Sequence, residues 1–95
     1  MEKSPAFEAQ LAAVRKQIDT VDSALVRLLA KRFSLVKKVG KIKKATGRPP
    51  TDRNRERLIV SRARFIAQKT GLPVPVVEKV FYSIFTEAKK MHRRA

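Results

Sequence analysis

Five charged residues in the middle of the chain are of types, and at spacings, that suit the binding of a small anion. Arg32 interrupts an apolar series, and a charge there is costly to bury unless an anion meets it. Lys43 follows eleven residues later, which on a helix is about 20° from the same face and about 16 Å along the axis. Asp52, Arg55 and Glu56 are spaced i, i+3 and i+4, so they share one side of a helix. Because guanidinium groups bind carboxylates bidentately, the set predicts a pocket for a ligand with two carboxylates and a hydroxyl.

Each position also has a structural interpretation. Arg32 could extend to solvent or pair with a core carboxylate, and Lys43 lies in a lysine-rich stretch that could be plain surface. Asp52 could be only a helix cap, and the two charges after it only surface charges. The common orientation of all five side chains favours the ligand site over these structural interpretations. Walled by Val39 and Ile59, it would be a poor metal site and an unusual nucleic-acid site.

Arg15 flanks the same apolar series nearer the N-terminus. It lies 17 residues from Arg32, about 25 Å on a straight helix, so the two cannot hold one ligand within one chain. In an antiparallel dimer, Arg15 of one chain could reach the site of the other.

The element that positions these cations is one long helix, predicted from Pro5 to about residue 45. Its apolar members recur every three or four residues: Phe7, Leu11, Val14, Ile18, Val21, Leu25, Leu28, Leu35, Val39 and Ile42. About 38 helical residues would extend about 57 Å, whereas a compact chain of this length has a radius of gyration of about 12 Å. We therefore expect an intertwined homodimer in which a second copy covers this apolar seam. The alternative is a helix that breaks near Gly40.

Two shorter helices should follow. Residues 46–50 (Thr-Gly-Arg-Pro-Pro) should end the first helix, because the glycine can cap it and the prolines cannot continue it. Residues 71–73 (Gly-Leu-Pro) should end a second helix, which Thr51 or Asp52 caps, and start a third.

No strand alternation appears, so the expected fold class is all-α, with a single domain over residues 1–95. We expect residues 1–5 to be a disordered lead, although Ser4 and Pro5 also suit a helix start. In the second helix the apolar positions recur at helical spacing: Ile59, Ala63 and Ile66.

Composition excludes several kinds of site. The chain has no cysteine and one histidine, so disulfides, thiolate nucleophiles and Cys- or His-rich metal sites are excluded. Neither a signal peptide nor an apolar run of about 20 residues is present, so we expect a cytoplasmic protein that does not span a membrane.

The net charge of +15 has three interpretations. It could serve phosphate contacts with nucleic acid, steer a small anion, or form a solvated surface without a partner. Most of the few aromatic residues lie on apolar faces, so we do not expect platforms for base stacking or specific nucleic-acid binding. A basic helical nucleic-acid-binding protein is the alternative from a different functional class.

The order of these residues resembles that in the all-helical, type II chorismate mutases. The pattern is Arg15-x-x-Ile-Asp-x-Val-Asp22, Arg32, Val39-Gly-x-x-Lys43 and Asp52-x-x-Arg55-Glu56, and the likeness extends over residues 11–92. The resemblance implies an interlocked helical homodimer whose two active sites are each completed by Arg15 of the other chain. It also implies the Claisen rearrangement of chorismate to prephenate in the shikimate pathway, without cofactor or metal.

The resemblance further implies a role for each residue. Arg15 and Arg32 would clamp the two carboxylates, and Lys43 would contact a carboxylate and the ether oxygen of the breaking bond. The ring hydroxyl would be held by Asp52 and Glu56, with Arg55 positioning this end. The apolar walls would be Val39, Ile59 and Phe85. Such a rearrangement needs a near-attack chair and cations at the ether oxygen rather than a nucleophile.

Two positions depart from the family pattern. Ala88 stands where a small hydroxylated residue is usual, which removes a possible contact. His92 stands where Gln or Glu usually bonds the ether oxygen, and we expect it to assist Lys43 there. In that case kcat/KM should depend on pH near the value of about 6.5 that is typical of histidine. The alternative is a frayed helix end with His92 in solvent.

Three related functions stay open. Isochorismate-pyruvate lyases and mutases of amino-chorismates share the fold and the cationic cluster, although Asp52 and Glu56 fit the hydroxyl of chorismate. A mutase whose activity depends on a partner enzyme is the third.

Overall fold

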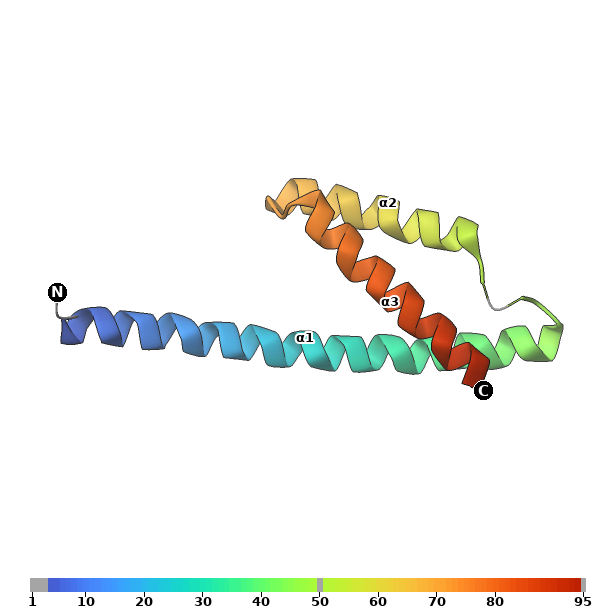
Figure 1. Cartoon of the computed structure of the whole chain (residues 1–95), viewed down its shortest axis with the longest axis horizontal. Helices are drawn as coiled ribbons and strands as arrows, with labels where there is room; N and C mark the ends of the chain where they lie inside the picture. The colour runs from blue at the N-terminus through green and yellow to red at the C-terminus, as the bar shows by residue number, and fades with distance from the viewer. Residues whose placement is uncertain (1–3, 50, 95) are drawn as a thin grey trace. The chain divides into compact units, whose positions relative to one another are not determined.

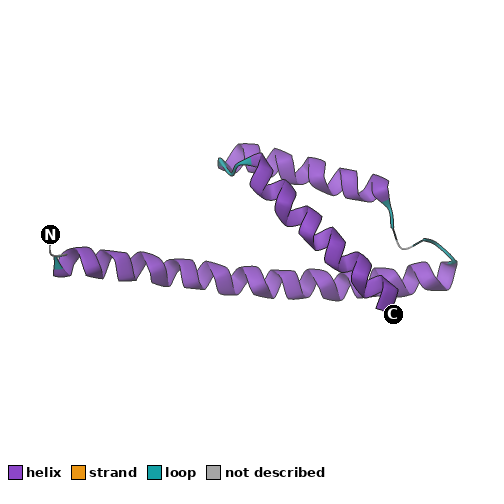
Figure 2. Ribbon diagram, viewed as in Figure 1, coloured by secondary structure: helices purple, strands orange, loops and turns teal. Residues whose placement is uncertain are grey.

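The structure contains the three helices that the sequence predicts. A computed structural model describes residues 4–49 and 51–94, and over these ranges its regular structure is entirely helical (Figure 1, Figure 2). Helix α1 is Pro5–Thr46, α2 is Arg53–Thr70 and α3 is Val74–Arg94. The all-α fold class is confirmed.

Local hydrogen bonds determine where α1 begins. The Ser4 hydroxyl accepts a hydrogen bond of 3.1 Å from the backbone N–H of Phe7, which satisfies one donor of the first turn. Pro5 follows as the first helical residue, where a missing N–H is tolerated. Ser4 and Pro5 therefore belong to the helix start, and residues 1–3 of the expected disordered lead lie outside the described residues.

Glycines end the first two helices. Gly47 has a φ of 71°, and the backbone N–H of Arg48 donates a 2.9 Å hydrogen bond to the carbonyl of Lys43, which closes the last turn of α1. Gly71 ends α2 with a φ of 76°. Because α1 continues through Gly40, the alternative of a break at that residue is wrong.

The chain divides into two compact units, one that ends at Ser34 and one that begins at Leu35. The first unit holds the N-terminal part of α1, in which Val21 is 65% exposed and Leu28 is 64% exposed. No residue of α1 is buried over its described length, Pro5–Thr46. Along the described part of the chain, the apolar seam is thus largely uncovered.

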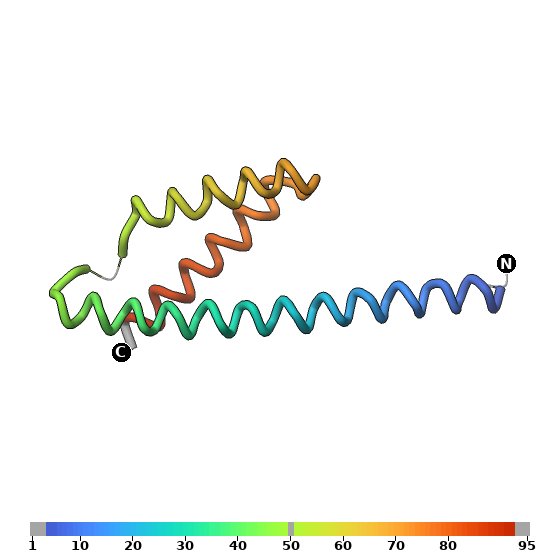
Figure 3. The backbone as a smooth tube through the Cα atoms, turned by 180° about the vertical axis from the view of Figure 1, so that it is seen from behind, coloured from blue at the N-terminus to red at the C-terminus, as the bar shows by residue number. Residues whose placement is uncertain are grey.

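The second unit has a small core where α2 and α3 pack together (Figure 3). Ala63 and Ala67 of α2 are buried together with Val77 of α3, and Val74 and Phe81 pack against them. Alanine side chains let two helices approach closely, because interaxial distance depends on the side chains at the contact. The turn at Gly71 reverses the chain, so the start of α3 lies beside the end of α2, and the two helices spread apart from there (Figure 3).

The buried face of α2 differs in part from the face that the sequence predicts. Ala63 is buried as predicted, but Ile66 is 59% exposed and Val60 is buried in its place. With 3.6 residues per turn, the stripe through Val60, Ala63 and Ala67 is a neighbour of the stripe through Ile59, Ala63 and Ile66. Periodicity alone could not choose between two adjacent stripes that share one residue.

An ion pair also joins α2 and α3. Arg64 Nη2 lies 2.7 Å from Glu78 Oε2. The hydrogen bond to Glu78, and then its charge, raise the pKa of Arg64. Because the Arg64 side chain is about half exposed, we assign this ion pair to the alignment of the two helices rather than to a net gain in stability.

Candidate active site

The first turn of α2 is built around Asp52. Its Oδ1 accepts a hydrogen bond of 3.0 Å from the backbone N–H of Arg55, so Asp52, rather than Thr51, is the N-cap. Short acidic side chains are preferred here because they satisfy a free N–H and complement the helix dipole. The cap holds the Asp52 carboxylate beside the end of α1.

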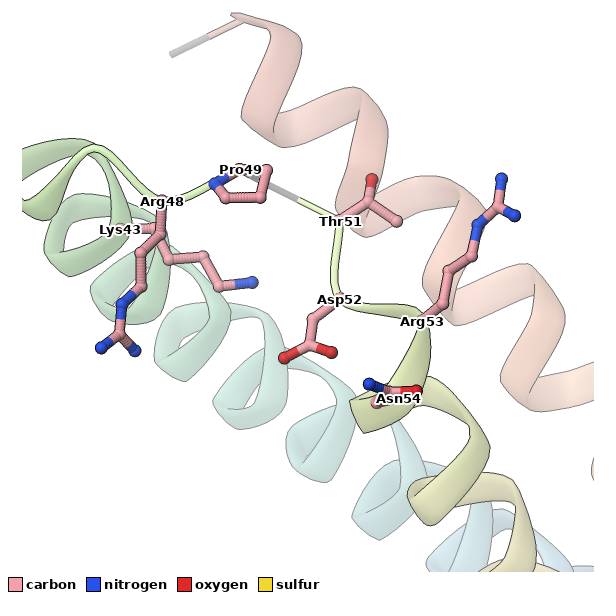
Figure 4. A pocket seen from close by; sticks show the side chains of 7 residues that line it. All are labelled: Lys43, Arg48, Pro49, Thr51, Asp52, Arg53 and Asn54. Atoms are coloured by element: carbon pink, nitrogen blue, oxygen red, sulfur yellow. The ribbon is translucent and has the colours of Figure 1, made fainter.

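Asp52 and Lys43 line one cavity of about 290 Å³, between the end of α1 and the start of α2 (Figure 4). The Lys43 ammonium and the Asp52 carboxylate both extend toward it, whereas the guanidinium of Arg53 points away. The residues that line it are Lys43, Arg48, Pro49, Thr51, Asp52, Arg53 and Asn54. The structure thus brings Lys43 and Asp52 together, as the sequence predicts.

Arg48 is a lining residue that the sequence reasoning missed. Its backbone N–H bonds to the carbonyl of Lys43, which fixes Arg48 next to the last turn of α1. The available signal was its place directly after the capping Gly47 and before a proline. Of the charged side chains that line the cavity, those of Lys43 and Asp52 extend toward it, so it offers one cation for an anionic group of a ligand and one carboxylate for a hydroxyl.

Glu56 lies on the same side of α2 as Asp52, four residues further on, and is half-buried. Its Oε2 is 3.4 Å from Nζ of Lys89 on α3, a contact that the sequence did not predict. Arg55 supplies its backbone N–H to the cap, and its side chain is exposed. The role of the Arg55 side chain stays a prediction.

His92 is half-buried near the end of α3, where its ring lies against Gly40 of α1. A Cβ atom added to Gly40 would come 2.6 Å from Cε1 of the imidazole. His92 is thus held within the second unit rather than in solvent at a frayed end, since α3 continues to Arg94. Ala88, one helical turn earlier, is half-buried.

The three predicted apolar walls have different surroundings. Phe85 is 7% exposed, and its ring packs against the rings of Phe81 and Tyr82 at centroid distances of 6.1 and 6.5 Å. Ile59 is half-buried, and Val39 is 46% exposed. Phe85 is therefore part of the core of the second unit, and the contacts of all three with a ligand stay predictions.

Arg15 and Arg32 both belong to the first unit. Arg15 is exposed and Arg32 is half-buried. Their spacing of 17 residues along one helix keeps them about 25 Å apart. The convergence of Arg32 with Lys43 on one ligand, and the donation of Arg15 to a second chain, stay predictions.

Within residues 4–49 and 51–94, no group of three or more His, Asp or Glu side chains is arranged to hold a metal ion. None of the described helices is long and apolar enough to cross a membrane.

Comparison with known proteins identifies the family. The sequence model of the family described as chorismate mutase type II matches residues 14–93. The chorismate mutase of Methanocaldococcus jannaschii is 32% identical over 85 residues, which are 90% of this chain and 86% of that protein. The T-protein of Enterobacter agglomerans is 40% identical over 80 residues, which are 84% of this chain and 21% of that protein.

A third relative is the bifunctional chorismate mutase/prephenate dehydratase of Escherichia coli (strain K12), 32% identical over 81 residues, which are 85% of this chain and 21% of that protein. The chain thus spans about a fifth of the length of the T-protein and of the E. coli protein. The family model, in contrast, covers most of the chain and includes every residue from Arg32 to His92 discussed above. The chain belongs to the chorismate mutase type II family.

Proposed function

We propose that this chain is a chorismate mutase, which rearranges chorismate to prephenate for the synthesis of aromatic amino acids. The observation that carries the proposal is the cavity that Lys43 and Asp52 line together, in a chain of this family. The Lys43 ammonium suits a carboxylate of the ligand, and the Asp52 carboxylate suits a ligand hydroxyl. The M. jannaschii relative named chorismate mutase is matched over 86% of its length, so a protein of about this length carries that name.

The reaction needs positioning and charge rather than a nucleophile. One C–C bond forms as the ether C–O bond breaks, within a single chair-shaped arrangement of the substrate. Clamping the two carboxylates with Arg32 and with Arg15 of the partner subunit would hold that near-attack geometry. Lys43, assisted by His92, would stabilise the negative charge that develops on the ether oxygen.

The opposite end of the substrate would be held by carboxylates. Asp52 and Glu56 would accept hydrogen bonds from the ring hydroxyl, beside Arg55. The Asp52 carboxylate can combine this role with the helix cap, since a carboxylate has two oxygens and only Oδ1 is used in the hydrogen bond to Arg55.

A homodimer would complete the site. The exposed apolar seam of α1 supports it, because contiguous apolar patches of this kind usually mark interaction surfaces. A second copy packed along the seam in the antiparallel sense would cover residues such as Val21 and Leu28 and bring its Arg15 toward this chain's Arg32. We propose that the two units act together as one domain within that dimer.

Turnover by the purified chain tests the proposal directly. Chorismate and isochorismate should be supplied separately, without any other enzyme, and prephenate and pyruvate measured. We expect prephenate from chorismate and no pyruvate from isochorismate. Pyruvate release would instead indicate a lyase, and activity that appears only when a second enzyme is added would show that the chain is not self-sufficient.

A further inference from the structure

Glu56 and Lys89 form an ion pair that links α2 to α3. Nζ of Lys89 lies 3.4 Å from Oε2 of Glu56, and the two side chains are 36% and 26% exposed. Lys89 directly follows Ala88 and precedes His92 by three residues, so it lies on the same part of α3 as these two predicted site residues. The pair joins residues 33 positions apart and is therefore a feature of the fold rather than of one helix.

A carboxylate in a site for a dianion creates an electrostatic difficulty. The negatively charged carboxylate of Glu56 must be correctly oriented to accept a hydrogen bond from a substrate hydroxyl. The same negative charge repels the two carboxylates of the substrate. A fixed cation at its far side would solve both problems, since it orients the carboxylate and offsets its charge.

We propose that Lys89 is a positioning residue for substrate binding, which holds Glu56 in place and offsets its charge so that a dianion can bind beside it. This inference rests on the proposed function of the site. Lys89 acts through Glu56 and does not itself contact the substrate. It is absent from the pattern of residues by which the chain resembles its family.

Lys90, the next residue along α3, provides a matched control for substitutions of Lys89. Lys90 Nζ lies 3.2 Å from Glu87 Oε1, but these two residues are on the same helix and more than half exposed. Removing either lysine changes the net charge of the chain by the same amount. Of these two lysines, Lys89 is the one paired with a carboxylate of the proposed site.

The test compares Lys89→Met with Lys90→Met in steady-state turnover of chorismate. Lys89→Met should raise KM roughly two- to fivefold, the range that coupling within a partly exposed ion pair spans. Its kcat should change little, because Glu56 would hold the hydroxyl equally in the ground state and the transition state. Lys90→Met should leave both constants unchanged, and Lys89→Arg should restore most of the affinity.

A double-mutant cycle shows through which residue Lys89 acts. In a Glu56→Gln background, Lys89→Met should raise KM no further, because the charge that it offsets is gone. An unchanged KM for Lys89→Met, or an equal increase in both backgrounds, overturns the proposal. If Lys89→Met unfolds, as followed by circular dichroism, Lys89→Gln replaces it in the cycle. A wild-type chain that does not turn over chorismate refutes the proposed function itself, which is a separate result.

Discussion

The imidazole of His92, on α3, lies against the backbone of Gly40 in α1. A Cβ atom added to Gly40 would come within 2.6 Å of Cε1 and 2.7 Å of Nδ1 of that ring. Glycine inside a helix is less favourable than alanine by about 1 kcal/mol. At this position the missing side chain makes room for the ring, so Gly40 sets where the imidazole can lie.

We predict that Gly40→Ala displaces His92 and lowers kcat/KM for chorismate several-fold. The ring is the far end of a flexible side chain, so it should move before the helices do, and the melting temperature should change little. In a His92→Ala background the same substitution should lower kcat/KM no further and should stabilise the fold by about 1 kcal/mol. Turnover and thermal unfolding in both backgrounds provide the measurement. An equal loss of activity in both would mean that Gly40 acts on a group other than His92.

The second prediction concerns the catalytic role of His92. If His92 donates a hydrogen bond to the ether oxygen beside Lys43, loss of that donor should slow the chemical step. We expect His92→Ala to lower kcat about a hundredfold, whereas His92→Gln, which keeps an N–H donor, should retain most of the wild-type kcat. Equal kcat values for the wild type and His92→Ala would refute the role.

Two substitutions can separate the role of Asp52 as a helix cap from its proposed role in substrate binding. Asparagine caps a helix about as well as aspartate, so Asp52→Asn should unfold at nearly the wild-type temperature. It removes the charged acceptor for the substrate hydroxyl, and we expect KM to rise about tenfold. Asp52→Ala loses both functions and should in addition destabilise the fold by about 1 kcal/mol. A wild-type KM for Asp52→Asn would leave this residue with the capping role alone.

Much of the fold could be predicted because helix ends are local. The hydroxyl of Ser4, the glycines at 47 and 71, and the carboxylate of Asp52 act within one turn of where they stand in the sequence. Residue type and spacing are then sufficient. The same locality explains why Lys43 and Asp52 could be placed together, since a short loop joins their helices.

The contacts that were missed are those between helices distant in sequence. The pairs Glu56–Lys89 and Gly40–His92 depend on where α3 lies. The sequence around each residue does not indicate which distant residue it contacts. The choice of Val60 over Ile66 as a buried residue has the same origin. Periodicity gives the width of an apolar stripe but not the side from which a neighbouring helix approaches.

The exposed seam of α1 makes a prediction about assembly. Val21 is 65% exposed in the single chain. There, Val21→Glu should lower the free energy of unfolding by less than about 0.5 kcal/mol. In a dimer it would bury a charge without a partner, so we expect the dimer to dissociate and activity to be lost at micromolar concentration. Molar mass by light scattering distinguishes the two cases.

Ser23 supplies the control for that experiment. Its hydroxyl bonds to the carbonyl of Asp19, and it lies on the opposite side of α1 from Val21. Ser23→Glu should leave the molar mass unchanged. A wild-type chain that is monomeric, or a Val21→Glu variant that stays dimeric and active, contradicts the proposed assembly.

The donation of Arg15 across the dimer can be tested by complementation. Arg15→Ala and Arg32→Ala should each lower kcat/KM by at least about a hundredfold, because each removes a cation from the carboxylate clamp. When the two variants are unfolded together and refolded as a mixture, half of the dimers should be hybrids. Each hybrid has one site with both arginines intact and one site with neither, so about a quarter of the wild-type activity should return. If both arginines served the same chain, every site would lack one of them and the mixture would stay inactive.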